Sequence, residues 1–237
     1  MTSAAAAILP EARSPLGFQS WLREMRILAA ATISPPMPCP VDTVPAGDGR
    51  AVLLIPGFLT GDWTTQPLRQ FLARAGYRAE AAGMVFNAGP TASLFDALST
   101  RVKSLADQTG RPIAVIGQSL GGVFARGLAQ DHPQEIDRVI TLVTPIRFPV
   151  TTPLAPFVWA LSIFHDPRFL ARRASIALPP RAPVTAIYSK TDGIVDWHQC
   201  LQDAAPHYEN VHVPGAHTTM GSNAQAQRIV AFRLAGQ

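Results

Sequence analysis

Short apolar runs alternate with segments of helical periodicity from about residue 50 to the end of the sequence. Runs such as Ala51–Ile55 and Ile113–Ile116 are typical of strands that are buried on both faces of a parallel sheet. Weaker or shorter runs predict four more strands, over residues 77–84, 138–143, 184–188 and 210–213. Because helical segments separate these runs, the sequence predicts an α/β fold with a doubly wound, mostly parallel sheet.

The predicted helices follow from apolar residues that recur every three or four positions. One helix is expected over residues 91–108 and another over residues 224–234. A helix with Pro67 near its first turn and Gly76 just past its end is expected after the first strand. A further helix is expected over residues 197–204.

Residues 1–49 precede the alternating pattern, so we expect them to be an extension of a main domain at residues 50–237. Apolar residues recur there at helical spacing, namely Phe18, Trp21, Leu22, Met25 and Leu28. They predict a helix over residues 16–31 whose apolar stripe packs on the main body, with a membrane-surface helix as the alternative. A proline-rich segment, residues 35–40, has to be irregular or extended.

Residues 144–183 interrupt the alternation of strands and helices. The segment is rich in proline but carries Leu154, Phe157, Val158, Trp159, Leu161, Ile163 and Phe164. Long connections inside compact domains are usually functional, so the sequence predicts a helical lid insertion here. The alternative is a pair of helices that only cover the core.

Composition narrows the class of protein. The 237 residues are 47% hydrophobic and 15% charged, which suits one globular α/β domain. The net charge is +4, and the basic residues are scattered along the chain apart from Arg172 and Arg173. No nucleic-acid partner is therefore expected. No apolar run is long enough for a transmembrane segment. Cys39 and Cys200 lie far apart, which favours a reduced, cytoplasmic setting, with a single disulfide as the alternative.

The strongest chemical signal is the Gly-x-Ser-x-Gly pattern around Ser119. It follows the predicted strand Ile113–Ile116 and precedes a segment of helical period, which is the context of a nucleophile elbow. Such an elbow holds its serine in a strained backbone conformation, and Gly117 and Gly121 permit the tight turn. The alternative is a glycine-rich turn that carries a surface serine.

A serine nucleophile needs a base, and the base needs an acid that orients it. In a parallel sheet these groups lie on loops at the carboxyl ends of strands. Among six histidines, His217 is the predicted base because it follows the last strand through a Pro-Gly turn. Asp192 is the predicted acid because it follows its strand and precedes Gly193, with Asp196 as the alternative. The order Ser119, Asp192, His217 is that of this class of fold.

The oxyanion of acyl transfer needs backbone donors, and the N–H groups of Leu120 and Phe58 are the predicted pair. The candidate pocket residues are Trp63, Asn87, Phe157 and Trp159. Core packing and turn formation are the alternatives for the first two. No metal or organic cofactor site is expected, because no ligand spacing or phosphate-binding glycine pattern is present.

Three motifs together resemble the α/β-hydrolase superfamily: Gln118-Ser119-Leu120-Gly121-Gly122, Thr191-Asp192-Gly193-Ile194-Val195 and Gly215-Ala216-His217. Pro56-Gly57-Phe58-Leu59 with Asn87-Ala88-Gly89-Pro90 resembles the bacterial lipase/esterase-like branch. The resemblance starts near residue 49 and leaves the N-terminal helix outside.

The resemblance implies a serine hydrolase that acts on an ester or thioester through an acyl-enzyme. The apolar insertion favours a small-molecule carboxylic ester with an apolar portion. The alternatives are a thioesterase, amidase or acyltransferase with the same triad, and a non-catalytic hydrolase-fold binding protein.

Overall fold

A computed structural model describes residues 16–162, 165–171, 176, 178 and 180–237 of the chain. Ile163 and Phe164, which the sequence assigns to the apolar insertion, lie outside the described residues, as do Arg172 and Arg173. Within the described part of the chain, none of the helices combines the length and the apolar character needed to cross a bilayer.

The core of the molecule is a parallel sheet of six strands in the order β2-β1-β3-β4-β5-β6. The strands are β1 Ala51–Ile55, β2 Arg78–Ala81, β3 Ile113–Gln118, β4 Ile136–Leu142, β5 Val184–Tyr188 and β6 Tyr208–His212. The predicted doubly wound sheet is therefore confirmed. The chain reverses its direction of travel across the sheet between β1 and β3, which are neighbours. Ligands of open α/β sheets bind beyond the carboxyl ends of the strands at such a switch point.

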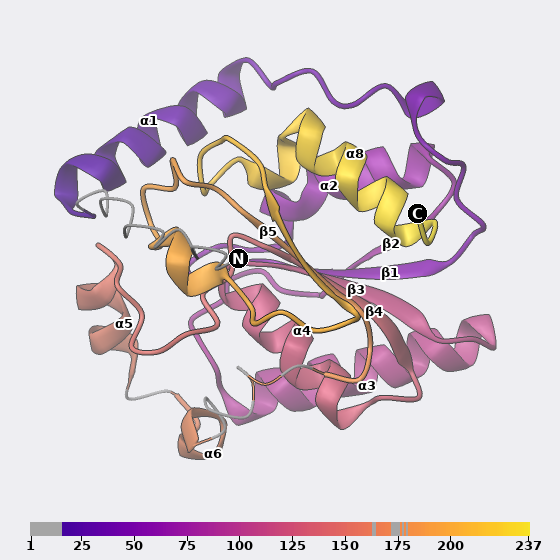
Figure 1. The fold of residues 1–237 in the computed structure, drawn as a ribbon. Coiled ribbons are helices and arrows are strands. Elements are labelled where there is room, and N and C mark those ends of the chain that lie inside the picture. Colours follow the sequence, from indigo (N-terminus) through magenta and orange to yellow (C-terminus); the bar gives the residue numbers. More distant parts are fainter. Residues whose placement is uncertain (1–15, 163–164, 172–175, 177, 179) are drawn as a thin grey trace, which may run out of the picture.

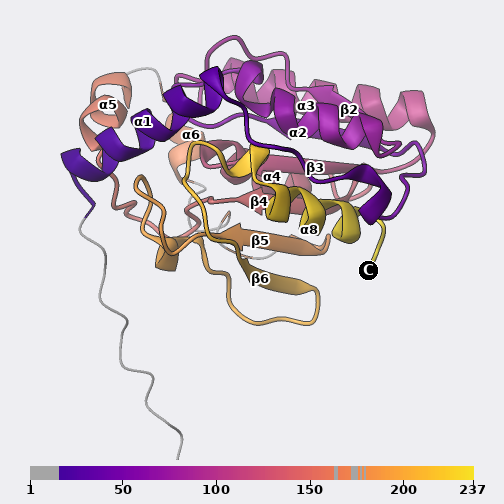
Figure 2. The ribbon, with the colours of Figure 1, turned by 90° about the horizontal axis from the view of Figure 1, so that it is seen from above.

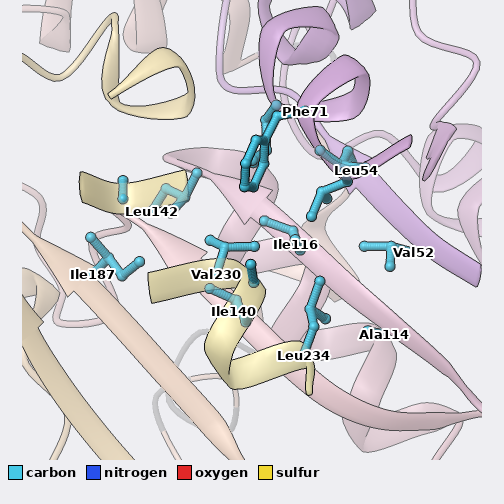
Figure 3. Packing of buried hydrophobic residues seen from close by; sticks show 14 of the residues in the cluster. Val52, Leu54, Phe71, Ala114, Ile116, Ile140, Leu142, Ile187, Val230 and Leu234 are labelled. Carbon is cyan, nitrogen blue, oxygen red and sulfur yellow. The ribbon is translucent and has the colours of Figure 1, made fainter. Parts of the chain in front are cut away.

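Helices cover both faces of the sheet (Figure 1). α2 Asp62–Arg74 and α8 Ala224–Leu234 pack on one face, and α3 Ala92–Thr109 and α4 Leu120–Asp131 on the other. Figure 3 shows the first of these interfaces, where Leu54, Ile116 and Ile140 of the sheet face Phe71 of α2 and Val230 of α8. Both faces of the central strands are buried, which explains why those strands read as continuous apolar runs.

The predicted N-terminal helix is present as α1, Phe18–Ile33. It runs past one end of the sheet, near α5 Ala155–Leu161 (Figures 1 and 2). The expected packing of its apolar stripe is only partly correct. Trp21 packs against Ile194 and Val195, but Phe18 is 69% exposed. The one fully buried residue of α1 is a carboxylic acid, Glu24.

Two helix predictions need correction. α2 begins at Asp62, so Pro67 lies inside the helix rather than in its first turn. The helix starts directly after Gly61, which is extended, and the Asp62 side chain accepts hydrogen bonds from the N–H groups of Ala82, Gly83 and Met84, so this end of α2 is tied to the loop after β2. The helix expected over residues 197–204 is only a 3₁₀ turn, Trp197–Cys200. The chain leaves it because the Gln202 side chain donates to the carbonyl oxygens of Val184 and Glu209 at the sheet edge.

The insertion after β4 carries α5 and α6 Pro167–Ala171 before the chain returns to β5. Arg126 of α4 anchors the returning chain. It is 1% exposed and donates hydrogen bonds to the carbonyl oxygens of Ile176 (2.9 Å) and Leu178 (3.0 Å). Burial lowers the pKa of this guanidinium to about 10. A buried cation thus ties the insertion to the central helix.

Cys39 and Cys200 are both buried and both free thiols. The disulfide that the sequence left as an alternative is therefore wrong.

Replacement of Asp62 by Ala tests how the loop after β2 is held. The change removes the acceptor of three backbone N–H groups, so we expect the free energy of unfolding in urea to fall by about 1–3 kcal/mol. Asp107→Ala is the matched control, since Asp107 is an exposed acid near the C-terminal end of α3. Equal stability of the two variants would contradict this account.

Candidate active site

The strand, sharp turn and helix that the sequence predicts around Ser119 form at the junction of β3 and α4. Ser119 has φ 53° and ψ −124°, a backbone conformation that residues other than glycine rarely adopt. A Cβ at Gly117 would collide with the carbonyl oxygen of Gly121, and a Cβ at Gly121 would collide with that of Ile55. The Ser119 N–H donates to Leu142 of β4 (2.8 Å). The close packing of β1, β3 and α4 therefore fixes the strained serine.

The loop after β1 lies directly against this serine. A Cβ built on Gly57 would be 3.2 Å from the Cβ of Ser119, and Phe58, Ser119 and Leu120 line one cavity together. Leu120 is the first residue of α4, so its N–H has no acceptor inside the helix. The Phe58 N–H makes no hydrogen bond with any residue that the structure describes. Phe58 and Leu120 thus line the cavity together with Ser119, and the structure gives neither N–H group an acceptor among the described residues.

Asn87 supports this loop from behind. Its Nδ2 donates to the carbonyl oxygen of Pro56 (3.0 Å), and its Oδ1 accepts from the N–H of Gly89 (3.1 Å). Its backbone exchanges hydrogen bonds with Leu59 and Thr60 (both 2.8 Å). Asn87 is fully buried and does not line the cavity, so it belongs to the turn rather than to the pocket.

Asp192 and His217 lie on the loops after β5 and β6 and form a buried pair. His217 Nδ1 is 2.7 Å from Asp192 Oδ2, and the two residues are 6% and 4% exposed. Asp192 Oδ1 accepts from the N–H groups of Ile194 (2.7 Å) and Val195 (2.8 Å). With the carboxylate held in this way, Nδ1–H is the donor and the His217 Nε2 carries the free lone pair.

A further contact joins the His217 loop to the elbow. Gln118, which precedes the serine, donates from Nε2 to the carbonyl oxygen of His217 (2.8 Å). The three sequence-predicted residues therefore belong to loops that are tied together at the carboxyl edge of the sheet.

The surroundings of His217 raise its pKa above the ordinary value of 6.5. Burial disfavours the charged imidazolium and acts to lower the pKa. The negative charge of Asp192, its hydrogen bond to the ring and the charge of Glu24 favour the imidazolium and outweigh burial.

Asp196, the alternative acid, has a different partner. Its Oδ1 is 2.7 Å from His198 Nδ1 and also accepts from the His198 N–H (3.1 Å). His198 in turn stacks on Trp197 with ring centroids 3.7 Å apart. The structure therefore pairs Asp192, and not Asp196, with His217.

A cavity of about 400 Å³ opens above Ser119. Its walls are mostly apolar and come from α4, from α5 and α6 of the insertion, and from the loop beside Asp192. The apolar residues that line it include Leu120, Val123, Leu154, Val158, Trp159, Phe169, Ile194 and Val195. The predicted pocket residue Trp159 lines the cavity, although it is 79% exposed overall. Phe157, on the same helix, does not line the cavity and is 49% exposed. Trp63 is 52% exposed and also lies outside, because α2 turns Thr65, Leu68, Phe71 and Leu72 toward the core.

The sequence does not predict two features at this site. His165 lines the cavity, and its Nε2 lies 3.2 Å from the carbonyl oxygen of Ala88, which joins the insertion to the turn behind Phe58. Glu24 of α1 accepts hydrogen bonds from the loops of Asp192 and His217. Its only signal in the sequence is an acidic residue flanked by apolar helical positions, which is common on solvated helices.

Comparison with known proteins shows which solved structures share this fold. No protein-family model and no curated protein matches the chain. Solved structures do: lipase B of Aspergillus fumigatus matches with TM-score 0.60 at 19% identity, over 80% of this chain and 54% of that one. This chain thus spans about half of the length of lipase B. A structure from work on LipS and LipT, two metagenome-derived lipolytic enzymes, matches with TM-score 0.64 at 17% identity, over 85% of this chain and 100% of that one.

A thioesterase domain from the curacin biosynthetic pathway matches with TM-score 0.58 at 14% identity, over 81% of this chain and 96% of that one. The chain therefore has the α/β-hydrolase fold, as its motifs lead us to expect.

Replacement of Asp192 by Asn tests the buried pair. Loss of the negative charge at 2.7 Å should lower the pKa of His217 by about 1–3, measured by NMR titration of the histidine rings. Asp196→Asn is the matched control, because this carboxylate pairs with His198. An equal decrease in the pKa of His217 in both variants would contradict the assignment.

Proposed function

We propose that the protein is a serine hydrolase that cleaves a carboxylic ester, with Ser119 as nucleophile, His217 as base and Asp192 as the acid that orients it. The observation that carries this proposal is the buried Asp192–His217 pair, tied through Gln118 to a serine in a strained elbow. A strained backbone at the serine costs free energy, and such strain is typical of active sites.

In the proposed mechanism, Ser119 Oγ attacks the ester carbonyl carbon while its proton moves to His217 Nε2. The N–H groups of Phe58 and Leu120 donate to the oxyanion that forms, and each such donor contributes about 2.7–4 kcal/mol to lowering the barrier. The intermediate collapses, the alcohol leaves with the proton from His217, and the acyl group stays on Ser119. Water then attacks the acyl-enzyme as His217 takes its proton. The bond between the acyl carbon and Ser119 Oγ breaks, His217 returns the proton to that oxygen, and the carboxylic acid is released.

The proposed substrate has an apolar acyl or alcohol portion. The supporting observation is the cavity above Ser119, whose walls are apolar apart from a few hydroxyl groups and His165. The described residues of the segment 144–183 contribute much of that wall, from the loop before α5 as well as from α5 and α6, and we propose that the segment acts as a lid.

A thioesterase is the second candidate, because the same acyl-enzyme forms from a thioester and a thioesterase domain is among the structures that share the fold. Amide hydrolysis and acyl transfer use the same triad. Product analysis with a competing alcohol separates hydrolysis from transfer.

Replacement of Ser119 by Ala tests the nucleophile. We expect it to remove both hydrolysis of aryl esters and labelling by a fluorophosphonate probe, because the acyl group of the proposed mechanism is bonded to Ser119 Oγ. Ser93→Ala, at an exposed position near the start of α3, should keep both activities. Wild-type turnover in the Ser119 variant would rule out the mechanism. Absence of labelling in the wild-type protein would favour a binding protein.

The pH dependence of ester hydrolysis tests the base. His217 accepts a proton only when neutral, and its pKa is raised above 6.5. Activity should therefore be low at acidic pH and rise to its half-maximum above pH 6.5, followed as kcat/KM for an aryl ester. A flat profile from mildly acidic to neutral pH would contradict this role.

Replacement of Trp159 by Ala tests the proposed acyl site. Loss of this wall should lower kcat/KM for a medium-chain ester by about tenfold and leave the acetate ester nearly unaffected. Phe157→Ala removes an aromatic ring from the same helix but outside the cavity, so it should leave chain-length preference unchanged. Identical preference in both variants would show that this part of the segment does not contact the substrate.

A further inference from the structure

We propose that Glu24 of α1 is a positioning residue that holds the loops of Asp192 and His217 in register, so that the N-terminal helix is part of the catalytic machinery. This inference rests on the proposed function. It assigns a role to a helix that lies outside the motifs of the fold.

Glu24 is fully buried and each of its carboxylate oxygens accepts two hydrogen bonds. Oε1 accepts from the N–H groups of Gly193 (2.9 Å) and His217 (3.0 Å). Oε2 accepts from the N–H (3.1 Å) and the hydroxyl (3.0 Å) of Thr218. A single oxygen atom thus bridges the residue that follows Asp192 and the backbone of His217 itself.

The helix α1 also packs closely against the loop that carries Asp192. A Cβ at Gly193 would lie 2.8 Å from Glu24 Cγ, so α1 packs close to the loop only because that residue is glycine. Ser20 Oγ donates to the carbonyl oxygen of Gly193 (2.8 Å), and Arg23 donates to that of Thr191 (2.8 Å). Residues from two successive turns of α1 therefore contact the loop that carries Asp192.

A carboxylate is a costly means of attaching a helix if stability is the only purpose. Burial of a charge is unfavourable unless it is well hydrogen-bonded, and an apolar side chain of similar size would attach α1 without that cost. Glu24 instead satisfies two N–H groups on the His217 loop and one on the Asp192 loop, and these lack other acceptors among the described residues. The arrangement fixes loop geometry, on which the distance between acid and base depends.

The charge of Glu24 also acts on the base. The carboxylates that act on the imidazole are Asp192 and Glu24, and both raise the pKa of His217 against the effect of burial. Asp196 and the Cys200 thiol lie near Asp192, and Arg23 lies at the exposed edge of the same loop. Loss of the Glu24 charge should therefore lower the pKa of His217 without removing its hydrogen bond to Asp192.

The test compares Glu24→Ala and Glu24→Gln in the full chain. The readouts are the rate of fluorophosphonate labelling against pH, kcat and KM for p-nitrophenyl butyrate, and the NMR titration of His217. Glu24→Ala should lower kcat and the labelling rate about tenfold to hundredfold with KM little changed, because loops displaced by a fraction of an ångström misplace the base. Glu24→Gln keeps one acceptor oxygen, so it should retain more of the rate.

Both variants should lower the pKa of His217, so their acid limb moves to lower pH even though the rate at neutral pH falls. Leu98→Ala, a core change in α3 far from these loops in sequence, is the control for lost stability and should keep the wild-type pH profile below its unfolding transition. If Glu24→Ala does not fold, Glu24→Gln decides through the pKa of His217.

An unchanged pKa of His217 together with unchanged kcat in the Glu24 variants would overturn the positioning role. The same would follow if Leu98→Ala reproduced their pH profile. Ser119→Ala distinguishes this failure from failure of the proposed function: if it still turns over the ester, the triad assignment falls, and if it is inactive while the Glu24 variants match the wild type, only the role of Glu24 falls.

Discussion

The contact between β1, β3 and α4 at residues without side chains is the constraint on which the site depends. The backbone around Gly117 and Gly121 leaves no room for a Cβ at either position. Because both residues are glycine, the chain can turn sharply there and hold Ser119 at positive φ. The same contact brings the loop after β1 against the serine, where Gly57 and Phe58 lie. Strain at the serine is sustained because buried strands and a buried helix on both sides over-determine the backbone there.

Apolar packing fixes the core of the sheet, and hydrogen bonds from buried polar side chains fix the loops at its edge. The loops after β5 and β6 have little regular structure, and they are held by hydrogen bonds to Asp192, to Gln118 and to Glu24. Each of these side chains satisfies backbone groups that would otherwise be buried without partners. In this arrangement the N-terminal helix is joined to the loops of Asp192 and His217 through a carboxylate, and the insertion after β4 supplies part of the apolar wall above the serine.

The sequence predicts the sheet, the parallel direction of its strands and the loops that carry Ser119, Asp192 and His217, because buried strands and the Gly-x-Ser-x-Gly turn leave strong local patterns. It does not predict Glu24, since the role of that residue arises only when α1 packs against loops far away in the sequence. Trp63 and Asn87 are candidate pocket residues in the sequence, with core packing and turn formation as the alternatives. The phase of α2 turns the first outward, and the amide of the second stabilises a turn. Such outcomes depend on tertiary packing rather than on local pattern.

The proposed mechanism requires that a covalent acyl-enzyme forms on Ser119. Rapid quenching of the protein with p-nitrophenyl butyrate, followed by intact-mass and peptide mass spectrometry, measures it directly. We expect a transient mass increase equal to one butyryl group, located on the peptide that contains Ser119. Turnover of the ester without any adduct, or with the adduct on another residue, would contradict the account.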